Sequence, residues 1–508
     1  MAQRAVTINP RWPGGIAVGL VLALSLGTLA AVAWRADFAR GLNGADWAAI
    51  KFTVSQALVS ATLSCLLAIP VARALARRRF WGRSVLVTLL GAPFLLPVIV
   101  AVLGLLAVFG RNGVLNNGLA AIGLPEVSIY GFHGVVLAHV FFNLPLVTRL
   151  ILQGWLAIPA ERFRLAASLN APVDRLLERP MLRSVLPPAF LVVFLICLTS
   201  FAVALTLGGG PRATTLELAI YQALRFDFDL GRAAMLALVQ FLLCGMAAAL
   251  AWRFAVVDTM GGGLDRSIER WDGNRWIDVF SIGFAAAFLL TPMAMIAVRG
   301  ASGVFDLPVD IWRAALRSIY VAMISAGICI TMTLSLALRG GWVVSLVGVL
   351  PLAASALVVG TGLFLVVFPF ANPATLALPI TALVNAVLAL PFALRSIAPA
   401  VEKITIEYAR LAATLDMSKR VWMIRIVLPR LWRPLGFAAG LAAALSMGDL
   451  GVIALFAGDA QETLPLAMYR LMGAYRMDAA TGAALVLLVL SFAIFWIFDR
   501  GGRVDADM

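Results

Sequence analysis

One polar stretch decides how this chain is organised: Glu407-Tyr-Ala-Arg-Leu-Ala-Ala-Thr-Leu-Asp-Met-Ser-Lys-Arg-Val-Trp-Met-Ile-Arg-Ile-Val-Leu-Pro429. It is basic and helix-forming, and it stands between long apolar segments. A weaker copy occurs about half the chain earlier, as Glu161-Arg-Phe-Arg-Leu-Ala-Ala-Ser-Leu-Asn170, and its continuation ends at Leu186-Pro187. The sequence therefore carries one polar segment in two versions, one in each half.

The composition is that of a membrane protein. Of the 508 residues, 62% are hydrophobic and 13% are charged, whereas a soluble chain is about half apolar and about a quarter charged. A net charge of +14 would suggest nucleic acid in a soluble protein. In a membrane protein, basic loops set the orientation instead, so no nucleic-acid partner is expected.

The histidines and cysteines do not form a metal site or a redox site by their spacing. His133 and His139 are six residues apart, which does not place them on one helical face as a metal pair. The cysteines all fall in apolar spans without metal-ligand or redox spacing, and we expect buried thiols at Cys65, Cys197, Cys244 and Cys329.

The apolar segments predict an all-α polytopic protein. A hydrocarbon core of ~30 Å needs about 20 apolar residues per helix. Segments of this length occur twelve times, and the longest of them could be tilted or carry a re-entrant end. Their ranges are 14–34, 52–75, 84–109, 132–156, 187–207, 233–254, 277–298, 317–338, 342–370, 375–394, 434–455 and 479–498.

The distribution of basic residues predicts that both termini are cytoplasmic. With the N-terminus inside, 28 of the 40 Lys and Arg residues fall in cytoplasmic segments, as the positive-inside rule requires. The first apolar run is too long for the apolar region of a signal peptide, so it is predicted to be a retained span.

The two halves are one unit written twice. Leu144-Pro145 pairs with Leu390-Pro391, and Arg164-Leu-Ala-Ala-Ser-Leu169 with Arg410-Leu-Ala-Ala-Thr-Leu415, both at an offset of 246. Six spans per half give both halves the same orientation, with a pathway expected between them. The predicted parts are an N-terminal segment with the first span (1–47), a first repeat (48–256), a linker with the seventh span (257–310), a second repeat (311–500) and a cytoplasmic tail (501–508).

The two polar segments are predicted to be cytoplasmic helices. Acidic residues stand at each expected helix start (Glu161 in the first copy, Glu402 and Glu407 in the second), and basic residues follow, as the helix dipole favours. Leu-Ala-Ala would present a small apolar face, and Leu-Pro would end each helix. One interpretation is an amphipathic helix lying on anionic lipid. Two equivalent copies favour two docking surfaces for a soluble partner, as in a transporter driven from outside the bilayer. The second copy has a ring of charge formed by Arg410, Lys419, Arg420 and Arg425.

These segments resemble the EAA loop of type I ABC importer permeases, whose pattern is Glu-Ala-Ala, a Gly four residues on, and then Ile-x-Leu-Pro. Anchoring the second copy on Ile426-Val-Leu-Pro429 places Arg410 at the Glu, Leu411-Ala412 at the Ala pair and Asp416 at the Gly. Only Ala412 and the closing Ile-x-Leu-Pro then agree with the pattern. The first copy has Arg164, Leu165-Ala166 and Asn170 at these places, with four extra residues before Leu186-Pro187.

The resemblance implies the type I ABC importer fold, with two parallel six-helix repeats in a bacterial inner membrane. It also implies a homodimeric cytoplasmic ATPase that binds the ATP, a periplasmic substrate-binding protein, surrounding lipid, and no cofactor on this chain. In this family the loop forms a coupling helix seated in the ATPase. The implied coupling residues are Arg164, Leu165, Ala166, Ala167 and Leu169 in the first copy, and Arg410, Leu411, Ala412, Ala413, Leu415 and Asp416 in the second.

Another stretch bears on the substrate: Ala204-Leu-Thr-Leu-Gly-Gly-Gly-Pro-Arg-Ala-Thr-Thr-Leu-Glu-Leu-Ala-Ile-Tyr-Gln-Ala-Leu224. It looks like the corresponding segment of thiamine importer permeases, as does Ser446-Met-Gly-Asp-Leu-Gly-Val-Ile-Ala-Leu-Phe456 in the second half, which lacks the glycine run. The resemblance implies import of thiamine or its phosphates. The alternatives are an importer of ferric iron or another small substrate, and an ion-coupled secondary transporter, which would need charge pairs within the membrane.

No enzyme activity is expected of this chain. The sequence lacks a Walker-type Gly-x-x-x-x-Gly-Lys-Ser/Thr run and has no nucleophile–base constellation, so the energy must come from a partner. The glycine runs at Gly208-Gly-Gly210 and Gly261-Gly-Gly263 lack the lysine and are predicted to be turns.

Asp449 is the charge within a span that we single out. An intramembrane carboxylate is costly and usually faces the interior of a helix bundle. A carboxylate there suits a cation such as thiamine, whose thiazolium ring is positive. Alternatively, Asp449 pairs with a nearby arginine, or lies at the outer interface and caps a turn. The predicted pathway residues are Asp449 and Ser446 in the second half and Thr199 and Ser200 in the first.

Overall fold

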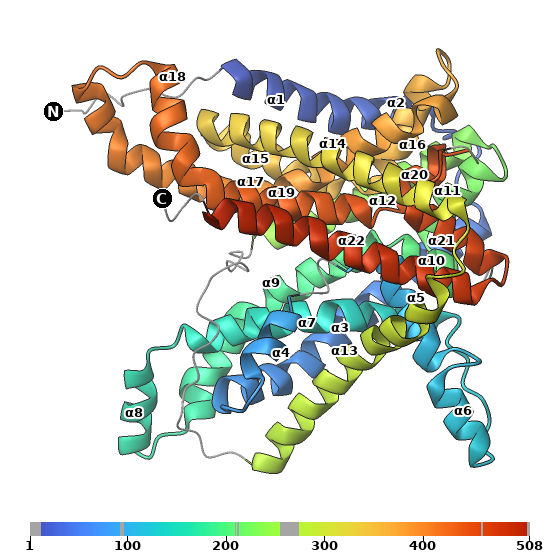
Figure 1. Cartoon of the computed structure of the whole chain (residues 1–508), viewed down its shortest axis with the longest axis horizontal. Helices are drawn as coiled ribbons and strands as arrows, with labels where there is room; N and C mark the ends of the chain where they lie inside the picture. Colours follow the sequence, from blue (N-terminus) through green and yellow to red (C-terminus); the bar gives the residue numbers. More distant parts are fainter. Residues whose placement is uncertain are drawn as a thin grey trace. The chain divides into compact units, whose positions relative to one another are not determined.

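The computed structural model describes residues 12–91, 96–208, 210, 213–253, 274–458 and 461–504, and these residues form an all-helical protein (Figure 1). Eleven helical segments in the described ranges are long and apolar enough to cross a membrane. The prediction of an all-α polytopic fold is confirmed. The glycine run at 261–263, most of the linker before the seventh span, the first eleven residues and the end of the tail lie outside the described residues.

The helices group into two compact units. The N-terminal unit comprises the described residues of 42–219 and 242–303. Two helices, α11 (Leu216–Arg225) and α12 (Leu230–Trp252), contain residues of both units. The helices that belong wholly to the N-terminal unit are α3 (Gly44–Arg77), α4 (Arg83–Leu89), α5 (Val98–Phe109), α6 (Val114–Ala121), α7 (Phe132–Leu156), α8 (Ala160–Ser168), α9 (Arg179–Leu198), α10 (Ala202–Leu207) and α13 (Arg275–Gly303).

The C-terminal unit comprises the described residues of 1–41, 220–241 and 304–508. Its helices are α1 (Trp12–Leu22), α2 (Thr28–Arg35), α14 (Val309–Arg339), α15 (Trp342–Ala353), α16 (Ala356–Val367), α17 (Ala377–Thr414), α18 (Lys419–Trp422), α19 (Leu428–Met447), α20 (Gly451–Phe456), α21 (Leu464–Gly473) and α22 (Met477–Val504). A single turn of π-helix joins α18 to α19, and another precedes α9.

The first and seventh spans lie outside the repeats in the sequence. The first span precedes the first repeat but packs against the second, and the seventh span precedes the second repeat but packs against the first. In the C-terminal unit, α2 of the first span meets α16, where a Cβ on Gly362 would lie 2.5 Å from Thr28 Cβ. In the N-terminal unit, α13, the seventh span, meets α5, where a Cβ on Gly104 would lie 2.8 Å from Ile296 Cδ1. Small residues allow such close approach between membrane helices. Each of these two spans therefore packs against the repeat that it does not precede. The sequence repeat does not predict this exchange of spans, because both spans lie outside the repeated segment.

One hydrogen bond recurs in both repeats. In the N-terminal unit, the Leu216 N–H donates to Thr53 Oγ1 at 2.8 Å. In the C-terminal unit, the Leu464 N–H donates to Ser318 Oγ, also at 2.8 Å. Both hydroxyls are buried, so each bond satisfies a polar group in an apolar setting. The shared contact supports the internal repeat inferred from the sequence.

Two of the predicted spans are interrupted. The range 342–370 contains two short helices, α15 and α16, and Ser355 caps α16 by accepting the Val358 N–H at 3.2 Å. The range 84–109 is likewise divided into α4 and α5, and Pro97 occupies the N-cap of α5. Neither α15 nor α16 alone is long enough to cross a bilayer. The twelfth crossing therefore stays a prediction that needs both helices together.

A buried ion cluster connects three elements of the N-terminal unit. Arg77, near the end of α3, has a side chain only 5% exposed and lies 3.5 Å from Glu178 and 3.8 Å from Asp278. Glu178 also pairs with Arg73 at 3.0 Å, and Asp278 with Arg78 at 2.7 Å. Glu178 precedes α9, and Asp278 lies in the first turn of α13. The cluster therefore joins α3 to the starts of the fifth and seventh spans.

Candidate docking and pathway sites

The first polar segment forms a short separate helix, α8, at the end of the N-terminal unit opposite α6 (Figure 1). Pro159 occupies its N-cap and separates it from α7, and Glu161 lies in its first turn, as predicted. The helix is held to its own unit by Phe163, which is buried. It ends before Asn170, whose φ of 49° is left-handed, a conformation that asparagine tolerates better than most residues.

The second polar segment is the end of a long helix. α17 runs without interruption from Ala377 to Thr414, so Glu402 and Glu407 lie inside it, and the prediction that they mark a helix start is wrong. The repeat offset places Thr405 opposite Pro159. The helix is continuous at Thr405, whose hydroxyl donates to the Val401 carbonyl at 2.8 Å, whereas Pro159 is the N-cap of a new helix in the first copy.

Both copies end in the same backbone conformation. Asp416 has a φ of 43° and Asn170 a φ of 49°, and the two residues are 246 positions apart, as the repeat requires. These left-handed residues end the polar helices, because a helix cannot continue through them. The second copy is also tied to the following span, since the Arg430 guanidinium lies 4.3 Å above the Tyr408 ring.

Two exposed leucines recur at matching positions of both segments. Leu165 and Leu169 are 60% and 69% exposed, and Leu411 and Leu415 are 52% and 63% exposed. Each pair is four residues apart and therefore lies on one helical face. The exposed leucines are accompanied in both copies by exposed predicted docking residues, namely Arg164 and Ala167 in the first and Arg410, Ala413 and Asp416 in the second.

The first alanine of each Leu-Ala-Ala motif faces the protein interior. Ala166 is 7% exposed and Ala412 is 2% exposed. The expected small apolar face is therefore divided, with Ala167 and Ala413 outside and their neighbours inside. The bulky leucines that flank the alanines supply most of the exposed apolar surface.

The Leu-Pro pairs do not end the polar helices as predicted. Leu186-Pro187 lies within α9, and Leu428-Pro429 opens α19 directly after the π-helical turn 423–427. Pro187 lies inside α9 and Pro429 follows the π-helical turn without a break, so neither proline ends its helix, in keeping with the tolerance of membrane helices for proline. The π-turns at 174–178 and 423–427 are 249 residues apart, which pairs Pro429 with Pro180 instead of Pro187. With this pairing the second copy is the longer one, by three residues between Asp416 and its π-turn, and the expectation of four extra residues in the first copy is wrong.

Asp449 lies at the break between α19 and α20, within the apolar segment 419–456. Its Oδ1 accepts the Gly451 N–H at 3.2 Å at the start of α20. Its Oδ2 is buried and accepts no hydrogen bond of good geometry among the described residues, although the Asn385 amide and the N–H groups of Val452 and Ile453 lie close to the carboxylate. No ion pair of Asp449 with an arginine occurs in the described part of the chain. Asp449 therefore caps a turn, which was one of the alternatives to a role in the pathway. Its second carboxylate oxygen remains available to a further partner.

Asn385 of α17 joins this group, and sequence reasoning missed it. Its Nδ2 donates to Ser446 Oγ at 3.1 Å, and its side chain also lies close to Asp449. The N-terminal unit has a comparable buried contact, in which Asn143 Nδ2 lies 3.4 Å from Cys197 Sγ. An asparagine inside an apolar span is an available signal, because polar groups in a membrane helix need partners.

The other predicted pathway residues lie at the end of α9 in the N-terminal unit. Thr199 is the C-cap of α9, and its hydroxyl donates to the Leu195 carbonyl at 3.3 Å. Ser200 follows in the break before α10 and is partly exposed. The offset of 249 makes Ser200 the counterpart of Asp449, so only the second repeat carries a carboxylate here. Of the glycine run that follows, Gly208 ends α10 and Gly210 has a φ of 123°, as expected for a turn, whereas Gly209 lies outside the described residues.

Comparison with known proteins covers the whole chain. The thiamine transport system permease protein ThiP of Escherichia coli K12 is 37% identical over 100% of both chains. The ThiP protein of Salmonella typhimurium LT2 is 36% identical over 98% of both. The ThiP protein of Haemophilus influenzae is 35% identical over 90% of this chain and 89% of its own.

A more distant relative has a different name. The sulfate transport system permease protein CysW of Synechococcus elongatus is 29% identical over 30% of this chain. No family model matches the sequence. Because the match to the ThiP proteins runs from end to end at more than a third identity, the chain belongs to the family of thiamine transport system permease proteins, the membrane subunits of ABC importers.

Proposed function

We propose that this chain is the membrane permease through which an ATP-driven importer carries thiamine, or its phosphates, into a bacterial cell. The observation that carries this proposal is the full-length identity of 36–37% to proteins named as thiamine transport system permeases. The multi-pass helical fold is in keeping with it. The chain supplies the passage, and a partner subunit supplies the energy of ATP hydrolysis.

The ATPase would bind at the two leucine faces. One face consists of Leu165 on α8 and its C-cap residue Leu169, and the other of Leu411 on α17 and its C-cap residue Leu415. Exposed apolar patches with a charged rim are typical of protein interaction sites. Because the two faces have the same residue pattern, a homodimeric ATPase could place one identical groove on each. ATP-driven closure of that dimer would then move the two docking segments, and with them the spans that follow, between inward- and outward-facing states.

The cationic substrate would pass Asp449. The buried Oδ2 of Asp449 accepts no hydrogen bond of good geometry among the described residues, and Asn385 and Ser446 hold the surrounding group in place. A carboxylate in this condition favours a positive charge nearby, such as the thiazolium ring. The counterpart Ser200 carries no charge, so the attraction would be confined to one half of the passage.

The remaining proposals concern topology and partners. Both termini would be cytoplasmic, in a bacterial inner membrane, with the docking segments on the same side. A periplasmic substrate-binding protein would deliver thiamine from the opposite side. The chain itself would bind no cofactor.

Uptake in cells tests the substrate. A strain that lacks its own thiamine importer would receive this chain with its ATPase and binding protein, and entry of labelled thiamine would be measured with and without excess ferric iron or sulfate. Saturable uptake that unlabelled thiamine suppresses, and that iron and sulfate leave unchanged, is the expected result. Suppression by ferric iron or by sulfate instead of thiamine would show that the substrate assignment is wrong.

A further inference from the structure

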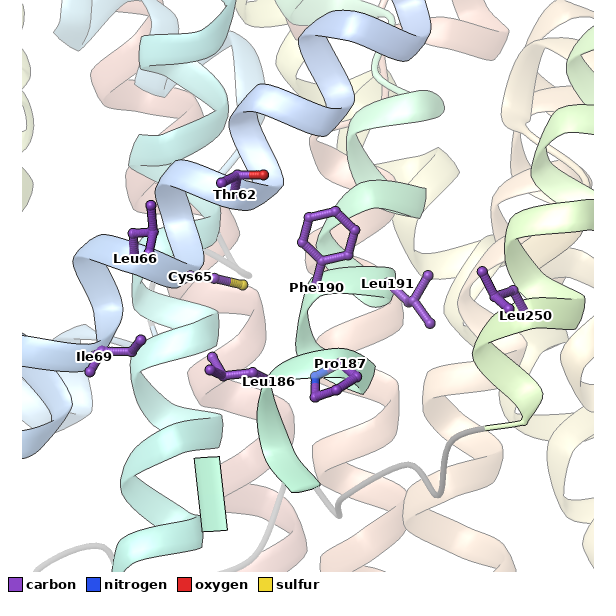
Figure 2. A pocket seen from close by; sticks show the side chains of 9 residues that line it. All are labelled: Thr62, Cys65, Leu66, Ile69, Leu186, Pro187, Phe190, Leu191 and Leu250. Atoms are coloured by element: carbon purple, nitrogen blue, oxygen red, sulfur yellow. The ribbon is translucent and has the colours of Figure 1, made fainter. Parts of the chain in front are cut away.

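An apolar groove lies between α3, α9 and the end of α12 in the N-terminal unit (Figure 2). Its volume is about 510 Å³. The single hydroxyl among the lining side chains, that of Thr62, donates to the Leu58 carbonyl at 2.8 Å within α3. The walls are therefore almost entirely apolar, and the hydroxyl proton of Thr62 is already used within α3. The lining residues are Thr62, Cys65, Leu66, Ile69, Leu186, Pro187, Phe190, Leu191 and Leu250.

All three helices that form the groove are long and apolar enough to span a membrane, so an open groove between them would have the hydrocarbon chains of the bilayer available as ligands. In Figure 2, the hydroxyl of Thr62 and the sulfur of Cys65 point toward α9, and Leu191 points toward Leu250 across the opening. A groove of this size lies within the range of small-molecule sites, about 300–1,000 Å³. An aliphatic chain is the chemistry that such walls can accept from a bilayer.

The second repeat fills the corresponding place with protein. The offset of 249 between α9 and α19 matches Pro187 with Gly436 and Leu191 with Gly440. In the C-terminal unit, a Cβ on Gly436 would lie 2.4 Å from the Phe498 carbonyl oxygen, so α22 packs directly on the α19 backbone. Proline and leucine at the matching positions of α9 do not allow that approach. The close contact of α22 on α19 therefore depends on glycines of the second repeat, and the first repeat has proline and leucine at the same positions beside the groove.

Arginines stand one helical turn beyond the groove on each of its three helices. Arg183 precedes Leu186 by three residues, Arg253 follows Leu250 by three, and Arg73 follows Ile69 by four. All three positions lie toward the same end of the spans, the end of α9 that follows the docking helix α8. Arg73 is engaged by Glu178 at 3.0 Å. Arg183 and Arg253 are exposed and have no ion pair among the described residues.

We propose that the groove binds one acyl chain of an anionic phospholipid and that Arg183 and Arg253 hold its phosphate. Basic residues at the cytoplasmic mouth of a cleft between membrane helices are suited to anionic headgroups. A zwitterionic lipid would gain the apolar contact but less from the two arginines. A membrane-spanning helix, about 10 Å across and about 30 Å long, has a volume several times that of this groove, so a helix of another protein does not fit into it. The site does not depend on which substrate the chain transports.

Native mass spectrometry of the full-length chain tests this site. The protein would be placed in nanodiscs with equal amounts of phosphatidylglycerol and phosphatidylcholine, released into detergent, and weighed with its retained lipids. Each arginine near the membrane surface contributes about five-fold in affinity for an anionic lipid, so loss of both contributes roughly thirty-fold. We expect the unmodified chain to retain one phosphatidylglycerol in preference to phosphatidylcholine, and the double variant Arg183→Gln/Arg253→Gln to lose that preference.

Two further variants separate the groove from general charge. Arg500→Gln removes an exposed arginine at the end of another span, α22, and retention of the lipid should not change. Thr62→Trp would fill the groove from an exposed position on α3, so the retained lipid should disappear although both arginines remain. Equal retention of the two lipids, an effect of Arg500→Gln as large as that of the double variant, or a retained lipid in Thr62→Trp would each overturn the proposal.

Discussion

Asp449 carries the most specific hypothesis at the level of single residues. One of its oxygens caps α20, and the other is buried and accepts no hydrogen bond of good geometry among the described residues. Since no arginine pairs with it there, Asp449→Asn leaves no cation stranded, and membrane abundance should be unchanged. The neutral amide would no longer attract a cation. We expect thiamine uptake to fall roughly ten-fold, the scale of a lost hydrogen bond to a charged group.

The measurement compares uptake with abundance in the same cells. Asp478→Asn is the matched control, because Asp478 is an exposed carboxylate at the start of α22 and the same substitution there should leave uptake intact. Unchanged uptake in Asp449→Asn would remove this residue from the pathway, whereas a fall in abundance would indicate that the carboxylate serves the fold.

We expect the Glu178→Gln substitution to lower the stability of the fold. Glu178 lies in a buried cluster with Arg77, and both side chains are about 5% exposed. Removing one partner of a buried pair costs about 3–5 kcal/mol, and Asp278 should limit the loss for Glu178→Gln to the lower end of that range. The measurement is thermal unfolding of the purified chain in detergent.

The control for Glu178 is on the same segment. Asp174→Asn removes the pair with Arg179, whose side chains are 49% and 60% exposed, and such pairs contribute at most about 1 kcal/mol. Equal shifts in the two variants would show that the buried cluster does not hold the ends of α3, α9 and α13 together.

At the level of residues, the sequence supports a prediction where the chemistry of one side chain is unusual for its surroundings. Asp449 could be singled out because a carboxylate in an apolar span is unusual, and Asn385 could have been found by the same argument. The orientation of Ala166 and Ala412 could not, because burial within a helix depends on the neighbouring spans against which each face packs.

The two docking segments expose leucines that are not needed for the fold. We therefore expect Leu411→Glu and Leu415→Glu, singly or together, to leave the fold intact and to prevent the ATPase from binding. We expect normal membrane abundance, loss of co-purification with the ATPase and loss of uptake. The same changes at Leu165 and Leu169 should act similarly, because the faces of the two copies match.

The neighbouring alanines provide the contrast. Ala413→Glu changes the exposed face and should behave like the leucine variants. Ala412→Glu places a carboxylate at a site only 2% exposed, so it should lower the amount of folded protein instead. If Ala412→Glu were well expressed and Leu411→Glu still bound the ATPase, the assignment of the docking face would be wrong.

Elements were predicted best where apolar length determines them. The spans 132–156 and 479–498 closely match α7 and α22 because nothing interrupts their apolar runs. The second docking segment was predicted as a separate helix because its acidic residues resemble a helix start. α17 is continuous at Thr405, where the first copy has proline, and a single such difference is not visible in the overall pattern. The Leu-Pro pairs were misleading as well, because proline is tolerated inside membrane helices, as at Pro187 in α9.

At the scale of the whole molecule, the sequence repeat revealed the two halves but not the exchange of their outer spans. The contacts of Gly362 with Thr28 and of Gly104 with Ile296 are between segments far apart in the sequence, and nothing in either segment identifies its partner. Orientation is different, because it depends on loop charge. A green fluorescent protein fused after residue 508 should fluoresce, whereas alkaline phosphatase at the same place should be inactive, and the reverse result would contradict a cytoplasmic C-terminus.

The central claim is that this permease moves thiamine by using an ATPase bound to its two docking segments. The most direct measurement is thiamine transport into proteoliposomes that contain the chain with its ATPase and binding protein. We expect accumulation that requires ATP, persists when ion gradients are collapsed, and is lost with the Leu411→Glu/Leu415→Glu variant. Accumulation driven by a proton or sodium gradient without ATP would contradict the account and would indicate a secondary transporter.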